Sequence, residues 1–347
     1  MWLSGVYHLG AILGNFLFGI LLNYFGRTKP MSLLALPNII FWVTVLLANN
    51  FSQLVVGRFV GGLTGGLFVC IPSFVAEIAN KELVKTDKRF FFDLFILLSA
   101  YRIRGFLGVM GPLIVAVGIL FAYICGAFVE FRLVPYCIIA VPVLFFIVMQ
   151  FMPETPHALL RRKHLQEIEK ESLKGLLSGV ALVVISIFSG IIVMTMHAAQ
   201  LFIDSGAVFS ASLSAIILGL LQVCGIYVSS MLVDRVGRRI LLGISSLGAA
   251  ISLFVFGTFS YLINQGYELS FFDWVPVVSG SFYIFINCVG IKPMPSLYVA
   301  EILPDNVRDI GLSICMMVMT MCTSISVFTL PLFVDLFGLY AVMWGYG

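Results

Sequence analysis

Charged residues are scarce in this chain of 347 residues. Asp, Glu, Lys and Arg make up 11% of it, whereas about 25% is usual in a soluble domain. Hydrophobic residues make up 61%. So little polar side-chain surface cannot cover a folded chain of this length in water. The composition excludes a soluble enzyme and predicts a protein that is surrounded by lipid.

The sequence also lacks the common patterns of metal, disulfide and nucleotide chemistry. Its seven cysteines show no Cys-x-x-Cys spacing and lie in apolar stretches, where buried thiols are expected. It contains no Gly-x-x-x-x-Gly-Lys-Ser/Thr run, so nothing in it supports a process driven by nucleotide hydrolysis. We expect no metal site, no cofactor and no catalytic residue.

Apolar segments of membrane-spanning length recur along the whole chain. A transmembrane helix needs about 20 apolar residues to cross about 30 Å of hydrocarbon. The last apolar stretch, 337–347, is too short by this measure. The sequence predicts an all-α membrane protein with about ten complete spans, at 1–24, 31–49, 54–79, 104–128, 134–152, 178–203, 209–232, 240–263, 276–302 and 310–336.

Positive charges gather on one side of the predicted membrane. Nearly all of the 20 Lys and Arg residues fall in loops on that side, while Arg58 and Lys292 fall within spans. An excess of Lys and Arg marks the cytoplasmic side of a membrane protein. The small net charge of +3 is therefore explained by membrane topology, and we expect no nucleic-acid partner.

A polar motif occurs once in each half of the chain. Residues 23–27 and 72–78 form the first copy, and residues 234–239 and 295–302 form the second. Two related halves, each a bundle of apolar helices, are the plan of many secondary transporters. The repeat predicts an N-terminal bundle, a short cytoplasmic linker and a C-terminal bundle, at 1–152, 153–177 and 178–347.

These motifs resemble those of the sugar porters of the major facilitator superfamily, most closely the insect facilitated trehalose transporter type. The matching segments are 153–156, 234–239 and 299–304 with the following Arg308. The resemblance covers nearly the whole chain and implies two pseudo-symmetric helix bundles. It also implies that the first family helix and most of the last are missing, because Met1 falls where the second family helix starts.

Residues 83–102 interrupt the resemblance. Glu301 and Arg308 are seven residues apart, whereas their first-half counterparts, Glu77 and Arg104, are 27 apart. Removing 83–102 restores the spacing of seven. We interpret this segment as a foreign insert, and the alternative is an amphipathic loop at the membrane interface.

The resemblance assigns a cytoplasmic gate to charged residues at helix ends. Ion pairs between the two halves would hold the cytoplasmic side shut and break when the halves rock. The alternative is that the basic residues only set the topology. Repetition of the set in both halves favours the gate. The matching residues are Arg27, Glu77, Arg104, Glu154, Arg238, Glu301 and Arg308.

The sugar site implied by the resemblance has lost most of its usual side chains. Such a site needs hydrogen-bonding groups and an aromatic face, and Ser296 stands where the family has a Trp. For each serine, the alternative role is a bond to a carbonyl one turn back in its own helix. The remaining candidates are Gln222, Ser186, Ser189, His197, Ser296 and Lys292.

Lys292 is an unusual residue within a span. A charge there is costly and is by default a functional-site hypothesis. Lys292 could recognise an anionic substrate or a carboxylate on another helix, or a non-functional copy could tolerate it. Pro293 and Pro295, which follow it, are predicted to break the helix and free backbone groups.

The leading interpretation of function is a carrier in the plasma membrane that moves a sugar, trehalose or a hexose, by alternating access. Facilitative uniport is preferred, because His8 is the only candidate for proton coupling found in the first-half spans beside Arg58 and the predicted gate residue Glu77. The alternative is a truncated paralogue that does not transport, or a sugar-sensing membrane protein. The depleted sugar site favours this alternative.

Overall fold

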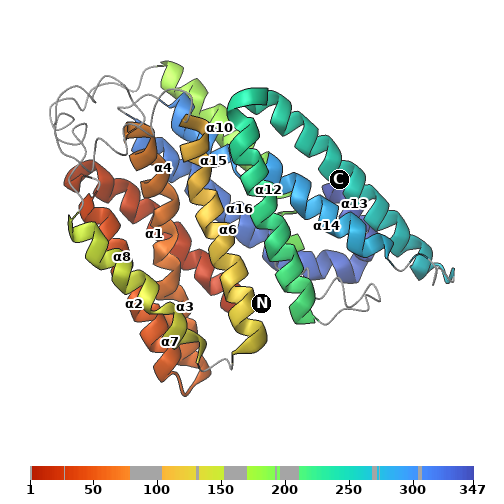
Figure 1. Cartoon of the computed structure of the whole chain (residues 1–347), viewed down its shortest axis with the longest axis horizontal. Helices are drawn as coiled ribbons and strands as arrows, with labels where there is room; N and C mark the ends of the chain where they lie inside the picture. The colour runs from red at the N-terminus through yellow and green to blue at the C-terminus, as the bar shows by residue number, and fades with distance from the viewer. Residues whose placement is uncertain are drawn as a thin grey trace. The chain divides into compact units, whose positions relative to one another are not determined.

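A computed structural model describes residues 2–26, 28–78, 104–129, 133–151, 170–191, 194–195, 211–267, 272, 274–303 and 307–347. Throughout these ranges the ordered elements are helices and no strand occurs (Figure 1). The helices are α1 (Trp2–Phe25), α2 (Thr28–Leu47), α3 (Phe51–Gly62), the 3-10 helix η1 (Leu63–Gly66), α4 (Leu67–Ile78), α6 (Arg104–Phe128), α7 (Val134–Ile138), α8 (Ala140–Phe151), α10 (Lys170–Phe188), α12 (Ala211–Val236), α13 (Arg238–Asn264), α14 (Val275–Val289), α15 (Met294–Ile302), α16 (Arg308–Phe337) and α17 (Leu339–Tyr346).

Nine helical stretches in the described ranges are long and apolar enough to cross a membrane, which confirms the predicted all-α membrane fold. They are Gly5–Leu22, Thr28–Leu47, Phe51–Ile71, Gly108–Phe128, Val134–Phe151, Leu213–Val236, Arg238–Asn264, Val275–Ile302 and Arg308–Phe337. The span predicted at 178–203 corresponds to a shorter apolar helix, Leu173–Phe188. Most of the rest of that span lies outside the described residues, as does the whole proposed insert at 83–102.

The surface of α13 shows that the fold is built for lipid. One face of this helix carries large apolar side chains at a spacing of three and four residues, each more than half exposed: Ile240, Ile244, Leu247, Ile251 and Phe254. The opposite face is buried and combines Ser245 and Ser252 with apolar side chains such as Leu253 and Phe256. A helix on the surface of a soluble protein also turns an apolar stripe to the core, but its outward face is polar.

The chain divides into two compact units, and each unit combines segments from both halves of the sequence. Unit one consists of Met1–Gly108, Glu130–Val184 and Ser296–Ser324. Unit two consists of Val109–Val129, Ile185–Pro295 and Ile325–Gly347. The boundaries predicted from the repeat, at 1–152, 153–177 and 178–347, follow the chain rather than these contacts and stay a prediction.

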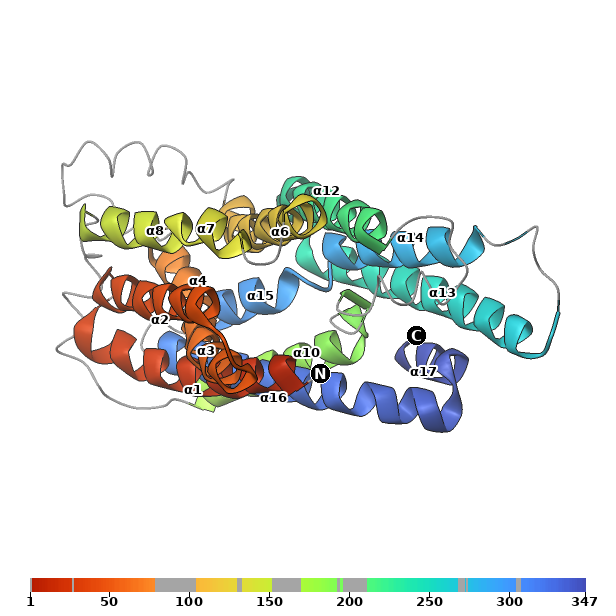
Figure 2. The same ribbon diagram turned by 90° about the horizontal axis from the view of Figure 1, so that it is seen from below.

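Glycine allows very close helix packing in unit one, where α1, α2 and α3 lie side by side (Figures 1 and 2). A Cβ added to Gly10 of α1 would overlap the carbonyl oxygen of Phe59. A Cβ added to Gly62 would overlap that of Tyr7. Small residues of this kind let helix backbones approach each other in a bilayer, where apolar side chains alone give no preference for protein over lipid.

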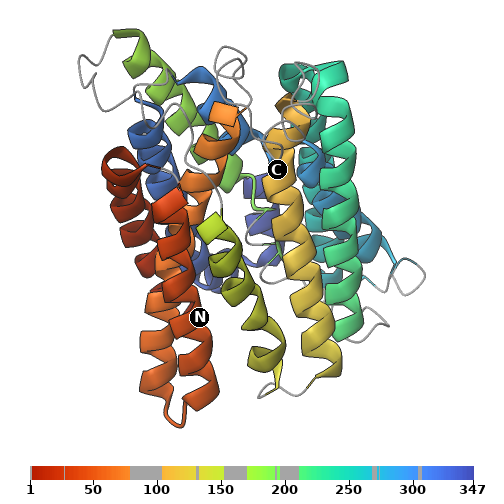
Figure 3. The ribbon, with the colours of Figure 1, turned by 60° about the vertical axis from the view of Figure 1, so that its left-hand side comes forward.

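Helix α14 is the centre of unit two and packs against α12 and α13, which run alongside each other (Figure 3). A Cβ on Gly225 of α12 would come within 2.8 Å of the Cβ of Cys288 on α14. Gln222 lies one turn before Gly225 on α12. The close approach of α12 and α14 therefore carries Gln222 to the side of α14.

Candidate functional site

The helix break predicted at Pro293 and Pro295 is confirmed between α14 and α15. Helix α14 ends at Val289, and α15 begins at Met294. Proline has no N–H and cannot continue the hydrogen-bond ladder, so Pro293 explains the break. The Lys292 N–H instead bonds the carbonyl of Asn287 at 3.0 Å, five residues back. The carbonyl of Ile291 is left free to accept a bond from another helix.

Helix α10 ends near that break. Its last residue is Phe188, and Gly190 then adopts a positive φ of 82°, a conformation open mainly to glycine. The Tyr283 hydroxyl on α14 donates to the Ser189 carbonyl at 2.5 Å. The Ser186 hydroxyl donates to the Ile291 carbonyl at 3.2 Å. These bonds join the end of α10 to the break after α14.

Two of the predicted substrate residues therefore already take part in structural bonds. Ser186 bonds across to Ile291, whereas Ser189 donates to the Ser186 carbonyl of its own helix at 2.7 Å. The bond of Ser189 is the alternative foreseen for a serine in a span. Contact of either hydroxyl with a substrate stays a prediction.

Gln222 and Lys292, predicted separately from the sequence, meet in unit two. The Lys292 Nζ donates to the Gln222 Oε1 at 2.7 Å. Gln222 is 0% exposed, and its Nε2 has no hydrogen-bond partner among the residues that the structure describes. The contact gives an ammonium group a neutral partner and leaves one buried amide donor unused.

Asn287 is a buried polar residue that the sequence analysis missed. It is 0% exposed, and within the described part of the chain neither amide atom of its side chain has a hydrogen-bond partner. Its backbone carbonyl accepts the Lys292 N–H, which places it one turn before the break. A primary amide in the middle of an apolar span was the available signal, because such a group needs a partner in the membrane.

The two remaining substrate candidates are not brought to this cluster by the described contacts. Ser296 lies on α15 in unit one, where it is partly buried. His197 lies outside the described residues. No group of three or more His, Cys, Asp or Glu that could hold a metal ion occurs in the described ranges.

The predicted gate residues are only partly within the described structure. Arg27 and Glu154 lie outside it, and the side chains of Glu77 and Arg104 are not described. Arg238 begins α13 in unit two, while Glu301 on α15 and Arg308 at the start of α16 belong to unit one. Their proposed pairing as a gate stays a prediction.

Arg308 has a clear local role. Its Nε donates to the Ala300 carbonyl at 2.9 Å, and its Nη2 donates to the Leu303 carbonyl at 3.4 Å. These carbonyls lie at the C-terminal end of α15, where helix carbonyls have no partner in the helix itself and a positive charge is favourable. Arg308 therefore joins the start of α16 to the C-terminal end of α15.

Unit one also contains hydrogen bonds between the two halves of the sequence that were not predicted. The Ser73 hydroxyl on α4 donates to the Asp309 Oδ1 on α16 at 2.5 Å, and both residues are 0% exposed. The Asn15 Nδ2 on α1 donates to the Thr320 Oγ1 at 2.9 Å. The Ser313 hydroxyl donates to the Asn15 carbonyl at 2.6 Å. We call these bonds the α16 link.

Sequence comparison identifies the family to which this fold and these polar clusters belong. The family model described as "Sugar (and other) transporter" matches residues 1–175 and 162–347. The chain belongs to this sugar transporter family. The match covers both sequence halves, so the resemblance predicted from the polar motifs is confirmed.

Several curated members of the sugar transporter family are similar to the chain. It is 26% identical over 389 residues to the facilitated trehalose transporter Tret1 of Apis mellifera ligustica, covering 100% of this chain and 73% of that protein. It is 25% identical over 388 residues to Tret1 of Aedes aegypti, of which it spans 46%.

Solved structures of sugar transporters share the fold. The proton:xylose symporter XylE of the major facilitator superfamily, bound to 6-bromo-6-deoxy-D-glucose, is 22% identical with a TM-score of 0.80. The alignment covers 99% of this chain and 82% of XylE. XylE from E. coli in a partially occluded inward open conformation has a TM-score of 0.72 at 20% identity, covering 99% of this chain and 83% of that one.

Proposed function

We propose that this member of the sugar transporter family is a carrier in the plasma membrane that moves trehalose or a hexose by facilitative uniport. The observation that carries the proposal is the pair of breaks after α10 and α14, with Ser186, Gln222 and Lys292 beside them. Discontinuous helices with polar groups at membrane depth form the substrate sites of many secondary transporters. The relatives named trehalose transporters support the choice of sugar.

The α16 link supports alternating access as the mechanism. Such a carrier needs contacts that close one end of the substrate path and separate when the other end closes. The bonds from Ser73 and Asn15 to α16 join helices of the first and second sequence halves. We assign the Ser73–Asp309 bond, which lies next to Arg308 at the start of α16, to the closed cytoplasmic end. It would act there together with the predicted gate of Arg27, Glu77, Arg104, Glu154, Arg238, Glu301 and Arg308.

Counterflow of labelled trehalose and glucose in cells that express the chain tests the proposal. Uptake is normalised to protein at the cell surface and compared with matched empty-vector cells. We expect counterflow above that control. We also expect a protonophore to leave net uptake into cells without preloaded sugar unchanged, because uniport does not use a proton gradient. Surface protein without uptake would contradict transport and favour a non-transporting paralogue or a sugar sensor.

A further inference from the structure

Lys292 lies within a membrane span and has a neutral partner. Its position is away from both ends of the span Val275–Ile302, so its ammonium group cannot be explained as an anchor at a helix end. An ammonium has three N–H donors. In the described ranges its side chain makes one hydrogen bond, to Gln222, so two donors are available for a further acceptor.

The nearest acidic residue in sequence on the helix that Lys292 touches is too far away to neutralise it. Asp234 follows Gln222 on α12 by twelve residues, which is about 18 Å along a helix at 1.5 Å per residue. Lys292 is bonded to Gln222, so the Asp234 carboxylate lies well beyond contact. A buried or partly buried charge is normally paired, and here the described contact is with an uncharged amide.

Two further features beside Lys292 favour a negative charge. The Gln222 Oε1 accepts from Lys292, which fixes the orientation of the amide and makes the unpartnered, fully buried Nε2 a second donor. The nine-residue helix α15 begins at Met294, directly after the break, and a helix N-terminus carries a partial positive charge. The Met294 N–H donates to the Gly290 carbonyl at 3.3 Å and Pro295 has no N–H, so this charge comes from the N–H groups that follow. Half-helices at such breaks direct this end toward anionic substrate groups in known carriers.

We infer that this carrier accepts a sugar that bears a carboxylate, such as a hexuronate, and binds it more tightly than the neutral sugars proposed above, because Lys292 binds the carboxylate. The inference rests on the proposed carrier function and specifies its substrate class. The carboxylate accepts from the free ammonium donors of Lys292 and from the Gln222 Nε2. A neutral sugar offers uncharged hydroxyl and ether oxygens, which form weaker bonds to an ammonium than a carboxylate does.

Equilibrium binding of labelled D-glucuronate and D-glucose to the purified whole chain tests the inference. A charge-assisted hydrogen bond contributes enough to predict about tenfold tighter binding of D-glucuronate than of D-glucose. We expect Lys292→Met to remove this preference by weakening D-glucuronate binding about tenfold while D-glucose binding changes little. Lys292→Arg retains the charge and is expected to retain the preference.

Lys174→Met is the matched control, because Lys174 is an exposed lysine on α10. It is expected to change neither affinity. Equal affinities in the unmodified chain, no binding of either ligand, or a preference that survives in a folded Lys292→Met protein would each overturn the inference. Counterflow distinguishes failure of this inference from failure of the proposed function. Glucose transport without a preference for glucuronate would reject the charged substrate and leave the carrier function standing. Selective binding of glucuronate without counterflow of any sugar would reject transport and leave the charged substrate standing.

Discussion

Ser73 and Asp309 illustrate how single polar atoms join helices in unit one. Both residues are fully buried, and the hydroxyl of one donates to the carboxylate of the other. A carboxylate removed from water depends on donors in the protein. Loss of one donor is therefore expected to lower the free energy of unfolding, even though it removes a single atom.

Ser73→Ala removes the donor and is expected to destabilise the folded chain. The cost of leaving part of a buried polar group unsatisfied is about 1–3 kcal/mol. Unfolding in mixed detergent micelles, followed by circular dichroism, measures it. Ser246→Ala is the control, since the Ser246 hydroxyl is exposed and bonds only within its own helix, to Gly243; a loss as large in the control would show that the Asp309 contact is not responsible.

Asn15 and Thr320 allow a direct measurement of the other part of the α16 link. The bond between their side chains is 2.9 Å long and buried. A double-mutant cycle with Asn15→Ala and Thr320→Val is expected to give a coupling energy of about 0.6 kcal/mol, the average for such bonds in membrane proteins. Additive effects of the two substitutions would contradict a direct interaction.

The sequence predicted Gln222 and Lys292 as site residues, but not their contact. They are 70 residues apart, and they meet because Gly225 allows α12 to approach α14 closely. That approach depends on packing in three dimensions and not on a local pattern. Asn287 was not predicted because it matches none of the family motifs, and the sequence does not show that its side chain is fully buried on α14.

At the scale of helices, glycine decides which pairs pack closely. Gly10 and Gly62 place the backbones of α1 and α3 in direct contact, and no side chain fits between them. Such contacts replace the hydrophobic driving force that is absent between helices in lipid. The contact of α1 with α3 is therefore expected to tolerate no added methyl group.

Gly62→Ala tests this expectation. The new Cβ would overlap the backbone oxygen of Tyr7, which cannot move without shifting α1. Overpacking of this kind costs about 1–3 kcal/mol. Gly126→Ala in α6 is the control because its Cβ would meet nothing within 4 Å. Unfolding measurements on both variants are expected to show a loss for Gly62→Ala only, and equal stabilities would refute the close contact.

Gly190→Ala tests the end of α10. Its positive φ makes alanine unfavourable by about 1–2 kcal/mol, and the Cβ would also approach the Tyr346 ring at 3.1 Å. Gly266 has nearly the same φ, 84° against 82°, and a Cβ there would meet no atom of the described residues within 4 Å. We expect Gly190→Ala to be more destabilising than Gly266→Ala. The difference between their unfolding free energies measures the clash of the new Cβ with the Tyr346 ring. Equal destabilisation by the two substitutions would show that this contact does not affect stability.

The breaks in the two helices were not equally predictable. Pro293 and Pro295 indicate the break after α14, because proline cannot donate to the helix ladder. The end of α10 at Phe188 has no such marker, and the apolar run from 178 to 203 reads as one span. Glycine is common within transmembrane segments, so Gly190 by itself does not indicate a helix end. Its positive φ could not be predicted from the neighbouring residues in the sequence.

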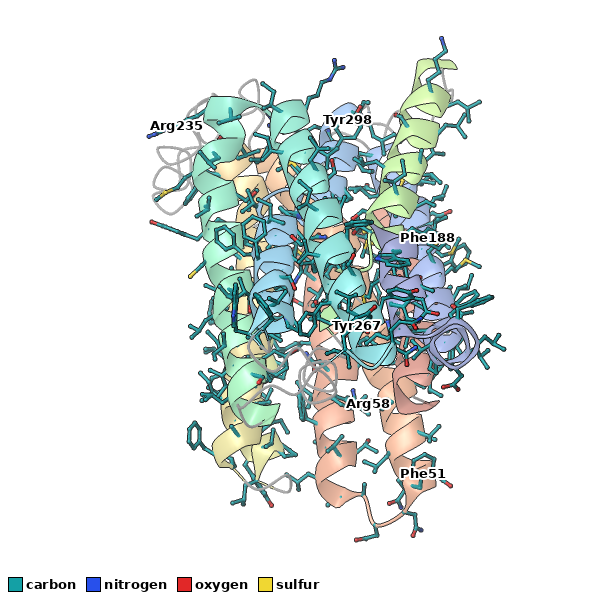
Figure 4. The ribbon with its side chains drawn as sticks, turned by 90° about the vertical axis from the view of Figure 1, so that its right-hand side faces the viewer. Phe51, Arg58, Phe188, Arg235, Tyr267 and Tyr298 are labelled. Atoms are coloured by element: carbon teal, nitrogen blue, oxygen red, sulfur yellow. The ribbon has the colours of Figure 1, made fainter. Side chains whose placement is uncertain are left out.

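At the scale of the whole molecule, the basic loops predict how the chain is oriented in the membrane. Arg235 lies where α12 turns into α13, and Tyr267 lies beyond the far end of α13 (Figure 4). Helix α13 has 27 residues and is long enough to cross the bilayer. The two ends of α13 are therefore expected on opposite sides of the membrane, with the Arg235 end cytoplasmic.

A cysteine at each end checks this topology. A membrane-impermeant maleimide applied to intact cells is expected to label Tyr267→Cys, and to label Arg235→Cys only after permeabilisation. The unmodified chain, which contains seven cysteines, supplies the background. Labelling of Arg235→Cys in intact cells would reverse the orientation and move the Ser73–Asp309 bond and the predicted gate to the outer side.

The two faces of α13 change what distinguishes inside from outside in this protein. The outward face carries large apolar side chains such as Ile244 and Leu247, and the inward face buries Leu253 and Phe256 together with Ser245 and Ser252. Hydropathy therefore no longer separates the interior from the surface, because both faces are largely apolar, and only the inward face is constrained by close packing. Exchange among Ile, Leu, Val and Phe is expected to be nearly free on the outward face, whereas enlarging an inward Ser or Gly is not. Amino-acid substitutions would accumulate fastest at the lipid-facing apolar positions of such a chain, whereas in a water-soluble fold the large apolar positions change most slowly.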